Sequence, residues 1–358
     1  MFVAGLIGAA VMTYAADADA DANDGWMPPA ARNDTQNDWI ELKSGEWLKG
    51  TFSHMYEDSV EFDSDVLDDL TIDWDDIKQI RFHQPMGVRL DNRTVHYGKV
   101  TMVDGVVTFE ESGTTAPRKD VVSIIPLYHD EIDRWELQAK LGLDFQSGNT
   151  DETRYTASID AERRTVSTRL NFSYLGNYTK TDGTESANNH RVGSNFDFFF
   201  DERMFIRVID IEYYRDKFQN LDTQLTIGAG VGYKIIDGKD FDWEIQAGPA
   251  YQYTEFNQVT AGSSKTAQSP AAIFSTTLDY DITDDLEYNL SYQGVLTNKQ
   301  SGLFTQHIVT SLEYELTSIF DVFVMLQVDR VENPQARSNG STPEQNDVTL
   351  SFGLGVDL

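Results

Sequence analysis

The fold is decided by one stretch in the middle of the chain, which is Trp135-Glu136-Leu137-Gln138-Ala139-Lys140-Leu141-Gly142-Leu143-Asp144-Phe145. Apolar and polar residues alternate along its whole length, so a β-strand with this sequence has one apolar face and one polar face. A two-faced strand this long and regular exceeds what the core of a soluble β-sandwich needs. We therefore interpret the stretch as a wall strand of a barrel.

The same alternation recurs to the end of the chain, and we count twelve such segments. Clear examples run from Leu225 to Tyr233, from Phe241 to Tyr253 and from Val348 to Leu358. About ten residues per strand, apolar outward and polar inward, is typical of transmembrane barrels. We predict an all-β protein with a 12-stranded antiparallel transmembrane β-barrel over residues 131–358, and a soluble sandwich is the alternative.

The connections between these segments give a second test, because outer-membrane barrels alternate short periplasmic turns with longer external loops. The expected short turns are 163–166, 201–203, 236–240, 283–285 and 317–319, and the expected longer loops are 179–188, 216–222, 255–269, 297–303 and 331–346. A domain that precedes the first strand then lies on the short-turn side, which is the periplasm.

Aromatic residues gather near the expected ends of the apolar faces, as in the two interfacial girdles of membrane barrels. Cross-strand packing in a soluble sheet is the alternative explanation. The expected girdle residues are Trp135, Trp243, Tyr251, Tyr253, Tyr280 and Tyr314.

A duplication precedes the barrel in a domain that we place at residues 38–130. Repeats at about 38–83 and 84–127 each contain an alternating strand, a turn, a short strand that ends in Phe, and an acidic turn followed by two spaced aliphatic residues. Internal repeats of this kind indicate stacked or paired supersecondary units. The pattern resembles small SH3 or Sm-type β domains, which bind peptides, proteins or polymers and rarely catalyse reactions.

The N-terminus resembles an export sequence. Residues 1–16 combine an apolar stretch with small residues, as a signal peptide does, although no Lys or Arg precedes the apolar stretch. We expect a disordered acidic spacer over residues 17–37, because Asp and Ala alternate there with little to bury. Calcium binding by those aspartates is disfavoured, since Ala22 stands where a calcium loop of the EF-hand type has Gly.

Composition excludes several function classes. The formal net charge is -31 and Cys is absent, which argues against nucleic-acid partners, disulfides and thiolate sites. The mean hydropathy of -0.42 argues against a helical multi-pass protein. The acidity is compatible with a high-salt habitat.

If the apolar face is outward, the opposite positions line the lumen and are mostly charged. They could line a water channel or form a self-satisfied ionic network that stabilises the barrel. The lumen candidates are Glu136, Lys140, Asp144, Arg154, Asp160, Arg169, Arg191, Asp197, Glu244, Asp279, Glu287, His307 and Glu313.

Catalysis has little support in the sequence. Only His190 and His307 lie in the expected barrel, on distant strands, and neither lies beside a nucleophile motif. No metal-ligand spacing of histidines occurs either. We predict no enzyme activity, no cofactor and no metal.

At this point the chain resembles a known family, the domain-of-unknown-function family 481 (DUF481), described as salt-induced outer-membrane proteins of the YdiY type. The resemblance covers roughly Arg134 to Leu358 and rests on Gly142-Leu143, Ser147-Gly148-Asn149-Thr150, Asp216-Lys217-Phe218-Gln219-Asn220-Leu221-Asp222 and Gly228-Ala229-Gly230-Val231-Gly232-Tyr233. The resemblance implies an outer-membrane barrel of unassigned activity.

The expected function is that of a porin-like narrow channel for small polar solutes or ions, or of an envelope protein that responds to osmotic or salt conditions. The alternative is a non-conducting structural or tethering barrel, and an outer-membrane hydrolase is less favoured. Expected partners are outer-membrane lipid, a periplasmic protein or polymer that binds residues 38–130, and the barrel assembly machinery during biogenesis. The expected location is the bacterial outer membrane, with the N-terminal domain in the periplasm.

Overall fold

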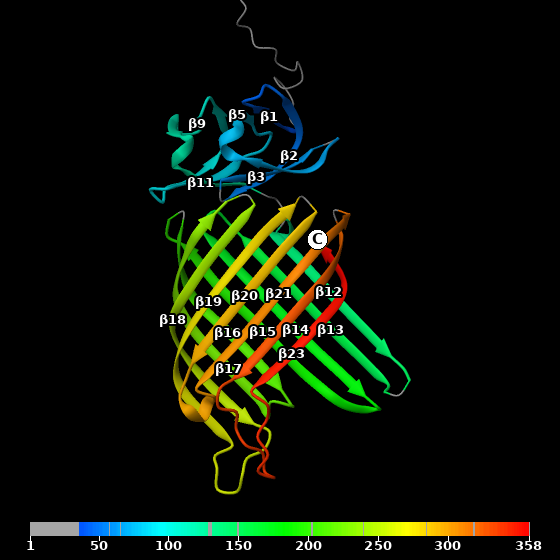
Figure 1. Ribbon diagram of the computed structural model, residues 1–358. Helices are drawn as coiled ribbons and strands as arrows, with labels where there is room; N and C mark the ends of the chain where they lie inside the picture. Colours follow the sequence, from blue (N-terminus) through cyan, green and yellow to red (C-terminus); the bar gives the residue numbers. More distant parts are fainter. Residues whose placement is uncertain are drawn as a thin grey trace, which may run out of the picture.

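The computed structural model describes residues 36–357 except 57, 65, 128–130, 149, 202, 239, 284 and 318. The predicted signal peptide and nearly all of the predicted spacer lie outside the described residues. The described chain folds into a β-rich front domain (β1–β11) and a closed 12-stranded barrel (β12–β23), which confirms the predicted fold class (Figure 1). Within the described ranges, no helix is long and apolar enough to cross a membrane.

The front domain is built from short strands joined by tight turns. Its strands are β1 (Asp38–Leu42), β2 (Trp47–Tyr56), β3 (Ser59–Ser64), β4 (Asp68–Asp73), β5 (Ile77–Arg81), β6 (Met86–Leu90), β7 (Val95–Gly98), β8 (Val100–Val103), β9 (Val106–Phe109), β10 (Thr114–Pro117) and β11 (Val121–Pro126). A 3-10 turn precedes the last strand of each repeat, η2 (Trp74–Asp76) before β5 and η3 (Arg118–Asp120) before β11.

The two repeats exchange strands and form one sheet. Within the first repeat, β1 pairs with β2 and β5, and within the second, β6 pairs with β7 and β11. Each last strand then pairs with the other repeat, β5 with β8 and β11 with β2. The result is a single 11-stranded sheet, so neither repeat is an independent folding unit.

One apolar core lies beneath this sheet and takes residues from both repeats, among them Phe52, Phe62 and Trp74 from the first and Met102 and Ile124 from the second. Its formation follows from the period-2 pattern, which places alternate residues of each strand on the same face.

Asp38 closes the first repeat on itself. Its buried carboxylate accepts hydrogen bonds from the backbone N–H of Phe52 (2.7 Å) and of His83 (2.6 Å), and the His83 ring nitrogen lies 2.7 Å away. Because a buried carboxylate needs hydrogen-bond donors, these contacts hold the start of the first repeat against its last residues.

The barrel strands are long and each pairs antiparallel with its neighbours in chain order. They are β12 (Trp135–Gln146), β13 (Glu152–Arg164), β14 (Thr168–Thr181), β15 (Thr184–Phe199), β16 (Met204–Asp216), β17 (Leu221–Asp237), β18 (Phe241–Phe256), β19 (Thr266–Thr283), β20 (Leu286–Leu296), β21 (Phe304–Thr317), β22 (Phe320–Val331) and β23 (Asn346–Asp357). Pairing of β12 with β23 closes the ring.

The predicted longer loops between β18 and β19, β20 and β21, and β22 and β23 are longer than the short turns, but the predicted loop 216–222 shortens to residues 217–220, no longer than the short turn 200–203. The predicted loop 179–188 is wrong, because β14 and β15 continue through it and pair as far as Thr181↔Thr184. Asp182 and Gly183 both adopt positive φ, the conformation that a two-residue hairpin turn requires. A cluster of Thr, Asp, Gly and Asn therefore marked a tight hairpin and not a long loop.

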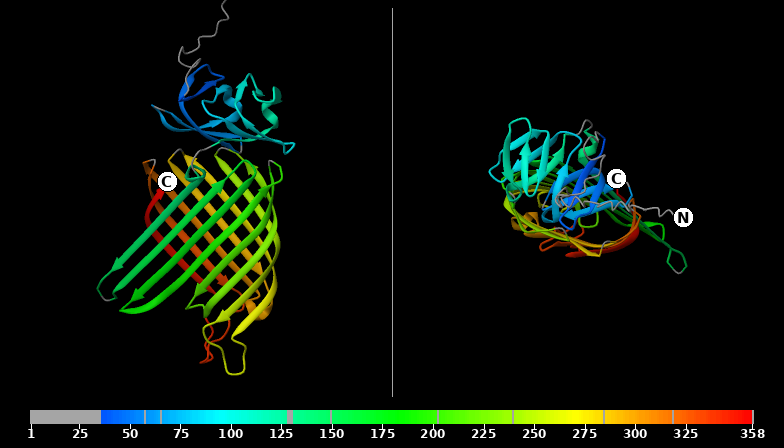
Figure 2. Two further views of the ribbon diagram at one scale, coloured as in Figure 1. Left: turned by 180° about the vertical axis from the view of Figure 1, so that it is seen from behind. Right: turned by 90° about the horizontal axis from the view of Figure 1, so that it is seen from above.

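The front domain lies over the short-turn end of the barrel, as the side views and the view from above agree (Figures 1 and 2). The last barrel strand ends at the same end. The longer connections, including those between β18 and β19 and between β22 and β23, lie at the opposite end. The lumen thus has two different mouths, one beside the front domain and one beside the long loops.

Candidate functional site

The outer surface of the barrel is apolar. Leu141, Leu350 and Leu354 are 50%, 45% and 59% exposed, and other outward residues at period 2 along the strands are similar. A soluble protein seldom leaves so wide an apolar surface in water. This surface fits the hydrocarbon layer of a membrane, and the polar groups face the lumen.

Near the short-turn mouth, an arginine cluster fills the lumen. Arg169 on β14 contacts Asp197 on β15 and Glu244 on β18, each at 2.9 Å, and Arg207 on β16 binds Asp197 at 2.7 Å. The Asp197 side chain is fully buried and accepts hydrogen bonds from both guanidinium groups. Charge-assisted bonds of this kind stabilise buried carboxylates that would otherwise lose their hydration.

A β-bulge brings Arg207 into this cluster. The pairing of β15 with β16 shifts register between Phe196 and Asp197, and Val208 and Ile209 are both exposed on the outer surface. The extra residue resets the alternation, so that Arg207 before it and Asp210 after it both face inward. Two consecutive apolar residues inside an alternating strand are the sequence feature that marks this bulge.

In the half of the lumen toward the long loops, Asp329 on β22 is the centre of a second group, the histidine cluster. It accepts from Arg191 on β15 and from the His307 ring on β21, both at 2.8 Å, and Gln327 donates to it at 2.7 Å. Arg191 also contacts Glu212 on β16 at 2.7 Å. The cluster joins β15 and β16 to β21 and β22.

A third group lies between these two. The Lys140 ammonium on β12 contacts the Glu313 carboxylate on β21, which also accepts from Ser311 at 2.7 Å and from Asn289 at 3.2 Å. The Glu313 side chain is 5% exposed and that of Lys140 is 9% exposed. This pair is therefore shielded from bulk water.

Several of these contacts cross the lumen. In the ring of strands, β14 and β18 are separated by three strands, β12 and β21 by two, and β15 and β22 by four on the shorter way round. The contacts Arg169–Glu244, Lys140–Glu313 and Arg191–Asp329 bridge these separations. Strands that are not neighbours in the ring are thus tied together at three places along the lumen.

The remaining lumen candidates are further polar residues of the inward face. The side chains of Glu136, Asp160 and Asp279 are exposed. Glu287 is half-buried and lies directly opposite Glu313 in the pairing of β20 with β21. Near the long-loop end, Arg154 contacts Glu152 at 2.9 Å and Asp144 at 4.0 Å. The short-turn mouth therefore carries accessible carboxylates.

The aromatic residues form groups on the outer surface near both ends. Tyr251, Tyr280 and Tyr314 are 49%, 40% and 46% exposed, while Trp135, Trp243 and Tyr253 are half-buried. The indole N–H of Trp243 donates to the Thr276 hydroxyl at 2.8 Å. Further outward aromatic pairs are Phe241–Tyr280, Phe145–Tyr155 and Tyr155–Tyr178.

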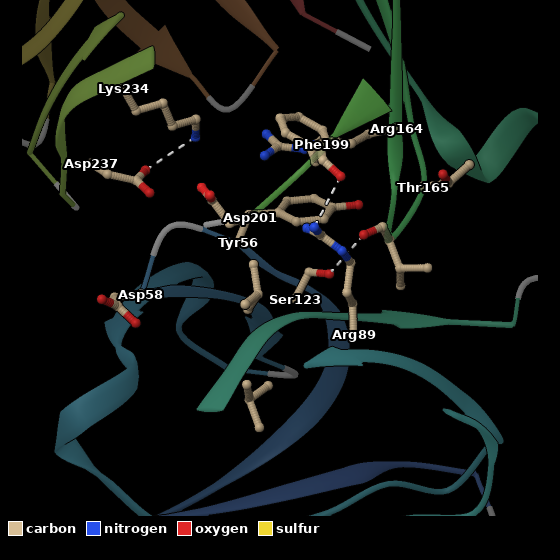
Figure 3. A pocket seen from close by; sticks show the side chains of 13 residues that line it. Tyr56, Asp58, Arg89, Ser123, Arg164, Thr165, Phe199, Asp201, Lys234 and Asp237 are labelled. Atoms are coloured by element: carbon tan, nitrogen blue, oxygen red, sulfur yellow. Dashed lines mark hydrogen bonds and ion pairs between the residues drawn. The ribbon is translucent and has the colours of Figure 1, made fainter. Parts of the chain in front are cut away.

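The front domain binds the short-turn mouth through specific contacts (Figure 3). The buried Arg89 side chain donates to the Phe199 carbonyl at 3.0 Å, and the Ser123 hydroxyl donates to the Val166 carbonyl at 3.2 Å. Arg93 lies over the Phe200 ring at 3.7 Å. Strands β6 and β11 are therefore held against two of the short turns.

On the front-domain side of this junction, Tyr56 and His54 lie near the barrel residue Arg164. The Arg164 guanidinium is 4.0 Å from the centre of the Tyr56 ring, and the His54 ring lies 4.6 Å from the Tyr56 ring. Burial, helped by the positive charge of Arg164, lowers the pKa of His54 to about 3. His54 is therefore neutral at neutral pH.

The barrel sequence matches a known protein family. A model for a family described as "Protein of unknown function, DUF481" matches residues 139–358, which is more than half of the chain. The chain belongs to the DUF481 family. No curated protein sequence matches it.

Solved structures similar to this DUF481 protein are barrels at low identity. The NanC porin is 13% identical with a TM-score of 0.38, and the match covers 62% of this chain and 98% of that chain. The translocator domain of the autotransporter NalP from Neisseria meningitidis is 10% identical with a TM-score of 0.34, covering 62% and 86%. The KdgM porin is 10% identical with a TM-score of 0.31, covering 62% and 97%.

Sequence reasoning missed some residues of the DUF481 lumen. Arg207, Asp210 and Glu212 follow or precede the bulge, so simple parity does not place them. Lys234, only 1% exposed, was missed as well and contacts Asp237 at 3.1 Å near the front domain (Figure 3). Alternation on β17 could have found Lys234, because it shares the inward face of Gly228 and Gly232.

The two histidines of the DUF481 barrel have separate surroundings. His190 lies 3.0 Å from the Tyr174 hydroxyl, and His307 contacts Asp329 in the lumen. Within the described ranges, no group of three or more His, Asp or Glu side chains is arranged to hold a metal ion.

Proposed function

We propose that the protein is an outer-membrane barrel with a closed lumen, and that it anchors the front domain at the periplasmic mouth. The observation that carries this proposal is the set of contacts that join non-neighbouring strands through the lumen, Arg169–Glu244, Lys140–Glu313 and Arg191–Asp329. In a pore wide enough for solutes or ions, these side chains would have to lie along the wall and not across the lumen.

The low exposure of the bridging side chains supports closure. Glu244, Glu313 and Asp329 expose 14%, 5% and 8% of their side chains. The cavity beside Arg191 has a volume of about 20 Å³, and a single water needs about 10–15 Å³. The space beside the Arg191–Asp329 contact therefore holds about one water.

Other parts of the chain lie over both mouths of the lumen. At the long-loop end, the Asn220 side chain donates to the carbonyls of Gln258 (2.8 Å) and Gln335 (3.1 Å), and Arg337 donates to the Phe218 carbonyl. Three connections are thus bound to one another there. At the other mouth, the contacts of Arg89 and Ser123 hold the front domain against the short turns. The outward apolar surface supports the bilayer location, and the side of the short turns supports a periplasmic front domain.

An anchor of this kind makes the front domain the part of the molecule that meets a periplasmic protein or polymer. Expression under raised salt, which the family resemblance implies, would be tested by comparing protein levels in cells grown at low and high salt.

The test is electrical. We expect the wild-type barrel, inserted into planar bilayers, to give no conductance steps, and the double variant Arg169→Ala/Arg191→Ala to give steps that favour cations, because carboxylates remain. Arg330→Ala is the matched control, since Arg330 pairs with Glu332 at 2.7 Å outside the bridging contacts. A different mobility of boiled and unboiled protein on a denaturing gel would show that each variant is folded.

The second candidate is the narrow channel. The exposed carboxylates Glu136, Asp160 and Asp279 at the short-turn mouth favour it, because rings of carboxylates attract cations into pores. Steady cation-selective conductance of the wild-type protein would support the channel and overturn the closed anchor.

A further inference from the structure

The seam that closes the barrel is unusually short. β12 and β23 pair only from Gln138↔Asp357 to Gly142↔Gly353. On its other side, β12 pairs with β13 over its full length. Beyond Gly142 and Gly353 the two strands diverge toward the long-loop end (Figure 1). Within the described ranges, residues 143–146 of β12 and 346–352 of β23 therefore have no strand partner on the facing edge.

Side chains from the lumen bridge part of this gap. The Thr156 hydroxyl on β13 lies 2.8 Å from the Ser351 hydroxyl on β23, and it reaches across Gly142, where a Cβ would come within 3.5 Å of Thr156. Next to it, Arg154 donates to the Leu350 carbonyl at 3.4 Å. Backbone groups left unpaired within a bilayer are costly, because no water is present there to hydrogen-bond them. An edge bridged only by side chains is therefore a place where another polar group is favoured.

The two sides of the divergent seam differ in chemistry. Outward from it, Leu143, Phe145 and Phe352 are 47%, 71% and 50% exposed and face the acyl chains. Inward lie the polar side chains of Arg154 and Thr156. The seam thus joins the apolar surface to the polar lumen at the level of the outer girdle.

We propose that this divergent seam is a binding site for one amphiphile of the outer leaflet, with its polar head group directed to Arg154 and Thr156 and its acyl chain against Phe145 and Phe352. We call these four residues the seam site. The inference rests on the proposed placement of the barrel in a bilayer. It adds a lipid-binding role to a barrel whose lumen is closed to solutes.

The charges near the seam select the head group. Arg154 is already paired with Glu152 at 2.9 Å and lies 4.0 Å from Asp144. One cation between two carboxylates leaves an excess of negative charge, so an anionic head group is repelled. A neutral or zwitterionic head group with hydrogen-bonding atoms fits the site.

A disulfide across the seam tests the proposal. If the pairing continued in the same register, Gln146 would face Thr349, and the chain contains no cysteine of its own. In the full-length variant Gln146→Cys/Thr349→Cys, which leaves the four seam-site residues intact, oxidation would link the two edges, and the reduced form is its own control. The pair Leu278→Cys/Leu290→Cys, which face each other on a fully paired seam, controls for the disulfide itself.

The readout is native mass spectrometry of the protein released from nanodiscs of a zwitterionic phospholipid. We expect one retained phospholipid on the wild type and the reduced variant, at least a tenfold lower retained fraction on the oxidised variant, and no loss on the oxidised control. Nanodiscs of an anionic phospholipid should give lower retention by the wild type. Equal retention in oxidised and reduced forms would overturn the site.

A second measurement does not depend on disulfide formation. A fluorescent label at Thr349→Cys, on the inward face of the unpaired edge, should be quenched by phospholipids with a spin-labelled head group. A label at Thr226→Cys, inward on a strand paired on both sides, should be quenched far less. Equal quenching at the two positions would also overturn the proposal.

Two other outcomes have distinct meanings. A protein dimer in place of bound lipid would assign the edges to strand pairing between two copies of the chain and overturn the lipid site. Failure of the folded barrel to enter nanodiscs would contradict the proposed membrane anchor itself, whereas a barrel that inserts and retains no lipid contradicts the seam site alone.

Discussion

The front domain and the barrel use the same alternating pattern with opposite sidedness. In the front domain, Phe52, Ile80 and Met102 are 0% exposed and the polar residues face water. In the barrel, Leu312 and Leu354 are 44% and 59% exposed, while Asp197 and Lys234 are buried. The alternation of apolar and polar residues determines only that the two faces of a strand differ in polarity. The surroundings, water for one region and lipid for the other, decide which face is outside.

The largest effect on stability is expected when an apolar side chain is removed from the core of the front domain. Phe52→Ala should destabilise that domain by about 3–5 kcal/mol, because it removes a fully buried ring that packs against Phe82. Limited proteolysis of the variant should cut the front domain at lower denaturant. The gel shift of the barrel should persist, and its loss would mean that the two regions fold as one unit.

A charge on the outer surface of the barrel should have the next largest effect. Leu312→Arg should cost about 2–4 kcal/mol in a bilayer, because a guanidinium near the middle of the membrane loses hydration. Val106→Arg is the matched control, since Val106 is 46% exposed on the front domain and should change stability by less than about 0.5 kcal/mol. Unfolding in urea from lipid vesicles measures both, and equal costs would contradict the membrane assignment.

The junction between the two regions should respond to pH through His54. Burial and the charge of Arg164 lower its pKa to about 3, below the value of about 6.5 in the unfolded chain. The unfolded state therefore binds the extra proton first as the pH falls. Stability from this group is complete above about pH 6.5 and is lost down to about pH 3, with a slope of at most about 1.4 kcal/mol per pH unit.

The variant His54→Gln isolates this effect. We expect it to flatten the pH dependence of front-domain unfolding between about pH 6.5 and 3. Unfolding curves of the wild type and the variant at several pH values measure the difference. An unchanged slope would mean that His54 is protonated freely in the folded protein.

The smallest expected effect concerns the docking of the two regions. Ser123→Ala removes the hydrogen bond to the Val166 carbonyl and should weaken the contact by about 0.5–1.5 kcal/mol. Faster hydrogen exchange at residues 165–167 would report it, with Ser112→Ala, whose hydroxyl contacts Thr114 within the front domain, as the control. Identical exchange in both variants would show that other contacts hold the junction.

Much of the fold could be predicted from period-2 alternation. That pattern located the barrel strands and the duplicated front domain, because the direction of a strand side chain depends only on its neighbours in sequence. It failed where local rules were ambiguous. The polar residues around Asp182 and Gly183 form a two-residue hairpin, and the bulge at Val208 reverses the parity of the residues around Arg207.

The candidate site was predicted in part. Parity assigned Arg169, Arg191, Asp197, Glu244 and Glu313 to the inward face, and the structure gives each of them a partner there. The choice between an open channel and an internal network could not be made from parity. It depends on whether side chains from distant strands reach each other across the lumen.

The sequence by itself determined most of the strands, the two faces of their regular stretches and the acidic character of the chain, because these follow from composition and short-range periodicity. Tertiary structure alone decided which charges meet, such as Arg191 with Asp329, how the repeats exchange strands, and how far β12 pairs with β23. The physical reason is closure. The number of strands and their stagger set the width of the barrel, and those quantities couple residues that are far apart in the chain.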